Sequence, residues 1–181
     1  MGWMIVFDLA EYQTLIVSVD SANSPSEKGN SLELLCKYFF ESINGIEVVE
    51  HDIRMGSEEI DLILWNAKLE TVFNPWDEVI LVECKNWSST VGAPLLDNFI
   101  SKLRRRCLKT GIFIAANGVT GGFVKGDGNE IGAVGVIREA LQEGIRVIVI
   151  KMEDLRDVKS VEDIKTLIKL RYCGIFVHKV F

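Results

Sequence analysis

Apolar and polar positions follow a helical period in the first long segment of the chain, residues 24–44. Ser24, Pro25 and Glu27 supply an N-cap, a first-turn proline and a capping-box acid, and the helix is expected to end near Gly45. Its apolar residues recur three and four positions apart, which predicts one buried stripe formed by Leu32, Leu35, Cys36, Phe39, Phe40 and Ile43.

Three β-type runs follow, at residues 46–53, 59–65 and 78–85, and their order predicts an antiparallel meander. A second helix is expected over residues 94–109. Its inward residues should be Leu96, Phe99, Ile100, Leu103 and Cys107.

The second half of the chain alternates buried strands with helices. Residues 111–116 and 145–150 are short apolar runs, with a helix expected between them at residues 129–143. Ser160 caps a last helix, and residues 175–181 are expected to form a final strand. Such alternation implies parallel crossovers, so the fold class is α/β with a mixed sheet.

The segment before the first helix differs from this pattern. Residues 3–19 contain two short β-type runs, which predict a hairpin or an arm. We therefore divide the chain into an N-terminal arm or hairpin at residues 1–24 and one domain at residues 25–181.

Composition narrows the class of protein. With 181 residues and 48% apolar side chains, one buried core is expected, and the net charge of −6 argues against coating nucleic acid by bulk charge. No segment has the layout of a secretory signal or a membrane span. The four cysteines show no paired spacing, which indicates reduced thiols in a cytoplasmic protein. Only two histidines are present, so any bound metal should be held by oxygen atoms.

Candidate chemistry gathers on two of the predicted strands. Glu83 and Lys85 alternate along one strand and so project from the same face, while Cys84 points the other way. Asp61 lies within another apolar strand, where an unpaired carboxylate would be costly. If the strands pair, Asp61 and Glu83 converge into an oxygen-rich site suited to Mg²⁺ or Mn²⁺, and hydrolysis of a phosphodiester is the natural reaction.

Asp61 followed by Glu83-Cys84-Lys85 resembles the PD-(D/E)xK nuclease signature, with Ile60 in place of the signature's proline. Residues 28–33 resemble the opening-helix motif, and residues 111–120 resemble the strand after the catalytic helix in Mrr-type restriction endonucleases. The resemblance covers residues 25–157. It implies a restriction-endonuclease-like core, α-β-β-β-α-β, with a further αβ extension.

The resemblance also assigns roles to side chains. It implies that Asp61 and Glu83 are metal ligands, that Lys85 is the catalytic lysine, and that Glu33 is an accessory metal-site or water-coordinating acid. Many relatives carry a glutamine on the helix after the lysine, whereas this chain has Asp97 and Asn98 in that region.

Each assignment has a structural alternative. Glu83 and Lys85 could form an exposed ion pair at a strand end, and Asp61 could be a buried hydrogen-bonding residue. Glu33 could belong to a second capping box with Asn30. Trp87 could stack on a base, but we expect it to pack.

A basic cluster follows on the second helix. Its members, which share one helix face, are Lys102, Arg105, Arg106 and Lys109. On an acidic protein this stripe is a candidate phosphate-contacting surface, and the alternative is a solvated helix face.

The sequence thus favours a Mg²⁺-dependent (or Mn²⁺-dependent) endonuclease acting on DNA, in restriction or repair. The alternative is a catalytically silent module that keeps the fold and binds nucleic acid or other subunits. One site cuts one strand, so double-strand cleavage would require a homodimer or sequential nicking, and target recognition could come from a separate subunit.

Overall fold

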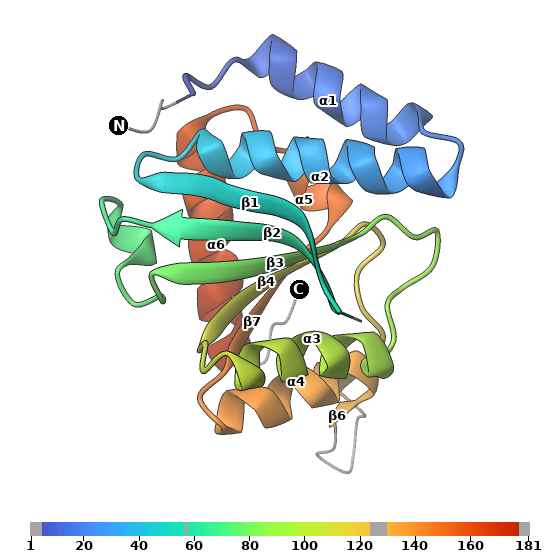
Figure 1. Ribbon diagram of the computed structural model, residues 1–181, viewed down its shortest axis with the longest axis vertical. Helices are drawn as coiled ribbons and strands as arrows, with labels where there is room; N and C mark the ends of the chain where they lie inside the picture. The colour runs from blue at the N-terminus through green and yellow to red at the C-terminus, as the bar shows by residue number, and fades with distance from the viewer. Residues whose placement is uncertain (1–4, 57, 124–129, 178–181) are drawn as a thin grey trace.

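A five-stranded mixed sheet forms the centre of the protein (Figure 1). The computed structural model describes residues 5–56, 58–123 and 130–177. In spatial order the strands are β1 (Ile46–Met55), β2 (Glu58–Asn66), β3 (Val79–Lys85), β4 (Thr110–Ala115) and β7 (Arg146–Ile150). The first three pair antiparallel, and β3, β4 and β7 pair parallel. The predicted meander and the mixed sheet are both confirmed.

Helix α2 (Pro25–Glu41) begins as the sequence predicts. The Ser24 side chain accepts a hydrogen bond from the backbone of Glu27, and the Glu27 carboxylate accepts from the backbone of Ser24 at 2.9 Å. The reciprocal pair satisfies two backbone donors that the first helical turn would leave open. Gly45 follows with φ of +81°, a conformation that is strained for residues with a Cβ.

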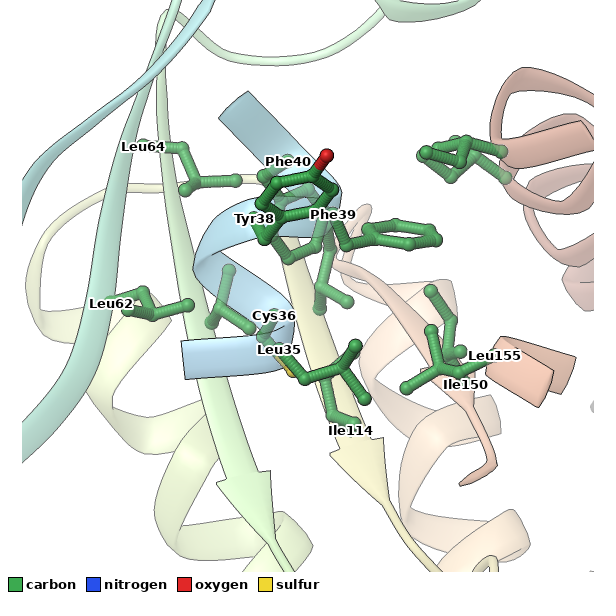
Figure 2. Packing of buried hydrophobic residues seen from close by; sticks show 14 of the residues in the cluster. Leu35, Cys36, Tyr38, Phe39, Phe40, Leu62, Leu64, Ile114, Ile150 and Leu155 are labelled. Atoms are coloured by element: carbon green, nitrogen blue, oxygen red, sulfur yellow. The ribbon is translucent and has the colours of Figure 1, made fainter. Parts of the chain in front are cut away.

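Helices cover both faces of the sheet. Helix α2 packs on one face together with α5 (Met152–Arg156) and α6 (Val161–Phe176), while α3 (Ala93–Arg105) and α4 (Gly132–Gln142) pack on the other. Alternate strand residues enter the two cores, as with Ile114 on the α2 face and Phe113 on the α3 face. Figure 2 shows Leu35 and Phe39 of α2 among the side chains gathered over the sheet. Smaller elements are the 3₁₀ turn η1 (Thr71–Phe73) and the short strands β5 (Gly122–Phe123) and β6 (Glu130–Ile131).

The β-type runs expected near the N-terminus are wrong for the described residues, because helix α1 (Leu9–Ser21) forms there and lies alongside α2 (Figure 1). Residues 3 and 4 of that expectation lie outside the described residues. Asp8 caps the helix by accepting from the backbone of Glu11. The buried Tyr12 donates its hydroxyl to the carbonyl of Leu155 at 2.9 Å, which ties α1 to the main core. The β-branched residues near its end favoured a strand, but the inward residues follow a helical period: Tyr12, Leu15, Ile16 and Val19.

Two further expectations are corrected. Helix α3 ends at Arg105, and Cys107 adopts a positive φ of 56° and is exposed rather than turned inward. The final strand expected at residues 175–181 is absent from the described part, where α6 continues through Phe176. Residues 178–181 of that expectation lie outside the described residues.

Candidate active site

Strands β2 and β3 separate at the point where the predicted acids lie. Their paired register runs from Trp65↔Val79 to Leu62↔Val82 and ends there. Beyond it, the Asp61 carboxylate accepts a hydrogen bond from the backbone of Cys84 at 2.6 Å. The buried carboxylate thus replaces the missing ladder acceptor and holds the two diverging strands together.

Glu83 and Lys85 project from the end of β3 toward Asp61. The Lys85 ammonium lies 2.7 Å from Glu83 Oε1 and 3.5 Å from Asp61 Oδ2. Only 20% of the Lys85 side chain is exposed, and Asp61 and Glu83 are buried, so the alternative of an exposed surface pair is wrong. The structure therefore brings together the three residues that the sequence singled out.

A second lysine, Lys102, binds the other carboxylate oxygen of Glu83. Lys102 of α3 is buried, and its ammonium donates to Glu83 Oε2 at 2.7 Å and to the backbone carbonyl of Glu59 at 2.6 Å. Its predicted place on an exposed phosphate-contacting stripe is therefore wrong. Two lysines now balance the charges of Asp61 and Glu83.

The spacing of residues along α3 could have predicted that Lys102 points inward. Leu95, Phe99, Lys102 and Arg106 follow each other four, three and four positions apart and so lie along one side of the helix. Because Leu95 and Phe99 pack in the core on this side, Lys102 follows them toward the sheet. Because residues 102–109 include five basic side chains, the segment was interpreted as an exposed surface, and the inward-facing position of Lys102 was missed.

The rest of the predicted stripe stays near the surface but is partly neutralised. Arg105 and Arg106 both form ion pairs with Glu58 of β2, with Arg106 Nη2 at 2.8 Å from Glu58 Oε2. Lys109 is exposed beyond the end of the helix. These three residues remain available at the surface.

Glu33 of α2 faces the same opening from the other side of the sheet. Because α2 already begins at Pro25, Asn30 lies inside the helix, and the alternative of a second capping box there is wrong. Burial, together with the charges of Asp61 and Asp52, raises the pKa of Glu33 to about 7. This carboxyl is therefore close to half-protonated at neutral pH.

An open cleft of about 500 Å³ joins these groups. The cleft is lined by Glu33, Glu59, Asp61, Cys84 and Lys85. Lys28 and Gly29 of α2 and residues 86–89 of the loop that follows β3 also line it. Asp61 and Lys85 are thus reachable from solvent although most of their atoms are buried.

Burial raises the pKa of Asp61, and the charge of Glu83 raises it further, whereas Lys85 and the Cys84 amide act in the opposite direction. For Lys85, burial acts to lower the pKa, but the charges of Asp61 and Glu83 outweigh it and the pKa is raised. Lys85 is therefore protonated at neutral pH and acts as a cation, not as a base.

The donor set is chemically suited to a small hard cation. Asp61 and Glu83 supply carboxylate oxygens, and the Cys84 carbonyl points to the same gap as the Cys84 amide because both groups of a strand residue face one side. Within residues 5–56, 58–123 and 130–177, no group of three or more His, Cys, Asp or Glu side chains is arranged to hold a metal. Mg²⁺ is commonly held by one or two carboxylates and waters, so the residues present fit such an ion.

The sheet order and the acid-x-lysine end of β3 define a restriction-endonuclease-like α/β domain. A restriction endonuclease family, Mrr_cat, matches residues 26–156, and the chain belongs to this family. The match agrees with the span of 25–157 expected from the motifs.

Similarity beyond the family is distant. The structure of Pyrococcus furiosus SfsA in complex with Ca²⁺ shares 18% identity with this chain at a TM-score of 0.40. The match covers 67% of this chain and 57% of that one, so the chain spans little more than half of the SfsA structure. No curated protein sequence matches significantly. No helix in the described part of the chain is long and apolar enough to cross a membrane.

The raised pKa of Glu33 should make the free energy of unfolding depend on pH. Between its usual pKa of 4.5 and the folded value of about 7, the folded protein keeps a proton that the unfolded chain has lost. The free energy of unfolding of metal-free protein should therefore fall as pH rises from 4.5 through 7. Glu33→Gln should remove the contribution of Glu33 and so make this slope shallower, while Glu139→Gln at an exposed site on α4 should keep the slope unchanged. Urea unfolding at several pH values is the measurement, and superimposable pH slopes for wild type and Glu33→Gln would contradict it.

Proposed function

We propose that the chain is a divalent-metal-dependent endonuclease that hydrolyses DNA phosphodiester bonds, in restriction or in repair. Membership of a restriction endonuclease family points to nuclease activity on DNA. The observation that carries the proposal is the cluster of Lys85, Asp61 and Glu83, of which Lys85 and Asp61 line an open cleft.

Asp61, Glu83 and the Cys84 carbonyl would hold the ion, as Mg²⁺ or Mn²⁺. When bound, it would polarise the scissile phosphate and offset the charge that develops there. Lys85 then lies beside both carboxylates, where its ammonium can orient the attacking water and stabilise the phosphate in the transition state.

Glu33 is suited to act as the general base that accepts a proton from that water. Its pKa of about 7 lies near the pH at which a general base is most effective, and it lines the same cleft. Hydrolysis forms a bond from the water oxygen to phosphorus and breaks the bond to the leaving oxygen, which takes up a proton from solvent. We assign Glu33 the role of positioning the water and accepting its proton.

Lys102 is assigned a positioning role. By holding Glu83 Oε2 it fixes the carboxylate so that Oε1 faces Lys85 and Asp61. A residue of α3 thus contributes to the site, four positions beyond Asn98.

DNA approach would use the remaining surface cations. Arg105 and Arg106 both pair with Glu58, and phosphate oxygens could share them with that carboxylate. Lys109 precedes β4 beside Asp77, at the end of the sheet opposite Lys85, and would contact DNA away from the scissile phosphate. Cutting both strands would require a homodimer or sequential nicking, and a separate recognition subunit could choose the target.

The second candidate is a catalytically silent module that keeps the fold and binds nucleic acid. One observation favours it: both carboxylate oxygens of Glu83 are already occupied by lysines. A metal must therefore compete with Lys85 for Glu83 Oε1.

A labelled linear duplex and its separated labelled strand together distinguish the two functions. Cleavage products from either form that require Mg²⁺ or Mn²⁺ and vanish in EDTA support the nuclease. If both forms are shifted but uncut, equally with and without metal, the silent module is supported and the nuclease is contradicted.

Asp61→Asn should weaken Mn²⁺ binding by at least about 100-fold, because losing a direct ligand should exceed the roughly 10- to 100-fold cost of losing a group that only orients one. The substitution keeps an acceptor for the Cys84 amide, so the fold should persist. Asp97→Asn, an exposed acid on α3, is the matched control. Calorimetry with Mn²⁺ measures both, and equal affinity for wild type and Asp61→Asn would place the ion elsewhere.

A further inference from the structure

Trp87 lies in the loop that follows β3, two residues beyond Lys85. It lines the same cleft as Lys85 and Asp61, and it is 45% exposed. Trp87 therefore keeps nearly half of its surface open to a ligand in the cleft, while the rest is covered by neighbouring residues.

The loop that carries this indole is held on several sides. Asn86 donates its side-chain amide to the carbonyl of Lys28 at 3.0 Å, and Asn117 donates to the carbonyl of Trp87 itself. Further along, the amide of Val91 donates to Gly118 at 2.9 Å. A ring presented on a fixed backbone loses little conformational entropy when a ligand covers it.

The surroundings indicate what kind of ligand fits. Lys28 lines the same cleft and offers a positive charge to a phosphate, while the indole offers a flat apolar face. Aromatic faces combined with nearby cations are how proteins bind single-stranded nucleic acid, because each base has a face that can stack. In an intact duplex those faces are covered by neighbouring base pairs.

We infer that Trp87 stacks on an unpaired nucleobase next to the scissile phosphate, so that the cleft takes single-stranded or locally melted DNA in preference to intact duplex. This inference rests on the proposed function, since that function places a phosphate at Lys85.

The chain provides a matched control in Trp65, which is also 45% exposed but lines a separate cleft with Ala67 and Leu69. Fluorescence anisotropy in EDTA measures binding of a labelled single strand and of the duplex of the same length. Trp87→Leu should weaken single-strand binding by about 5- to 150-fold and duplex binding by no more than about twofold, as expected for loss of one stacked base. Trp65→Leu should change neither, and Trp87→Phe should stay within a few-fold of wild type.

A second measurement uses the unaltered protein, so it does not depend on the folding of a variant. The fluorescent base 2-aminopurine is placed at successive positions of the single strand, and stacking on an indole should quench it at one of them. Unchanged single-strand affinity in folded Trp87→Leu, equal weakening of both DNA forms, or no quenching at any position would overturn the inference.

These outcomes separate the inference from the proposed function. If wild type cuts DNA with metal while Trp87→Leu binds single strands normally, base stacking fails and the nuclease stands. If wild type never cuts but Trp87-dependent single-strand binding persists, the nuclease fails and the stacking site stands.

Discussion

Lys85→Met is expected to lower the rate of DNA cleavage by about 10²- to 10³-fold, the usual effect of removing one electrostatic contributor to the transition state. Folding and metal binding should persist, because Glu83 keeps Lys102 and Asp61 keeps the Cys84 amide. Methionine also preserves the length and most of the packing of the lysine stem. Mn²⁺ binding should be retained or improved, since the ammonium that competes for Glu83 Oε1 is gone.

Lys68→Met is the matched control for this effect. Lys68 pairs with Glu78 at 2.6 Å at the surface, an interaction worth about 1 kcal/mol or less. Single-turnover cleavage at saturating protein and Mn²⁺ compares the three proteins, with thermal midpoint and Mn²⁺ affinity recorded for each. If Lys85→Met cut within a few-fold of wild type, Lys85 would not be catalytic.

Lys102→Met is expected to lower the free energy of unfolding by about 3 to 5 kcal/mol, the range for breaking a buried ion pair by removing one partner. The variant leaves the carbonyl of Glu59 and one oxygen of Glu83 without their donor, in a buried site. Retention of Lys85 beside Glu83 places the expected value at the lower end of that range.

Arg105→Met on the same helix is the matched control, because it removes a positive charge from the surface and not from the buried cluster. Arg105 is half-exposed and shares Glu58 with Arg106, so its loss should cost about 1 kcal/mol or less. Urea unfolding measures both variants under the same conditions. Equal loss of stability in the two would show that Lys102 acts as one more surface cation.

Local chemistry explains why much of the fold was predictable. Helix α2 is set by a capping box and an apolar stripe, and β4 is set by a short apolar run buried on both faces. The identities of Asp61, Glu83 and Lys85 followed from strand alternation together with the order of the motif. These features depend on residues that are close in sequence.

The features that sequence reasoning missed depend on distant contacts. Helix α1 contains a β-branched run that favours a strand. Its helical conformation is stabilised by packing on the main core, where the Tyr12 hydroxyl donates a hydrogen bond to the carbonyl of Leu155. Lys102 looked like a surface cation because its basic neighbours concealed the apolar side of the helix to which it belongs, and only the folded chain brings it to Glu83. In both cases a tertiary contact reveals what the residue does.

The most direct test of the central claim is nicking of supercoiled plasmid by wild type and by Asp61→Asn, each titrated with Mn²⁺ at the same protein concentration. Wild type should produce nicked circles to an extent that rises with Mn²⁺ and is abolished by EDTA, while Asp61→Asn should leave the plasmid supercoiled. Plasmid that stays supercoiled with wild type at every Mn²⁺ concentration, or equal nicking by the two proteins, would contradict that claim.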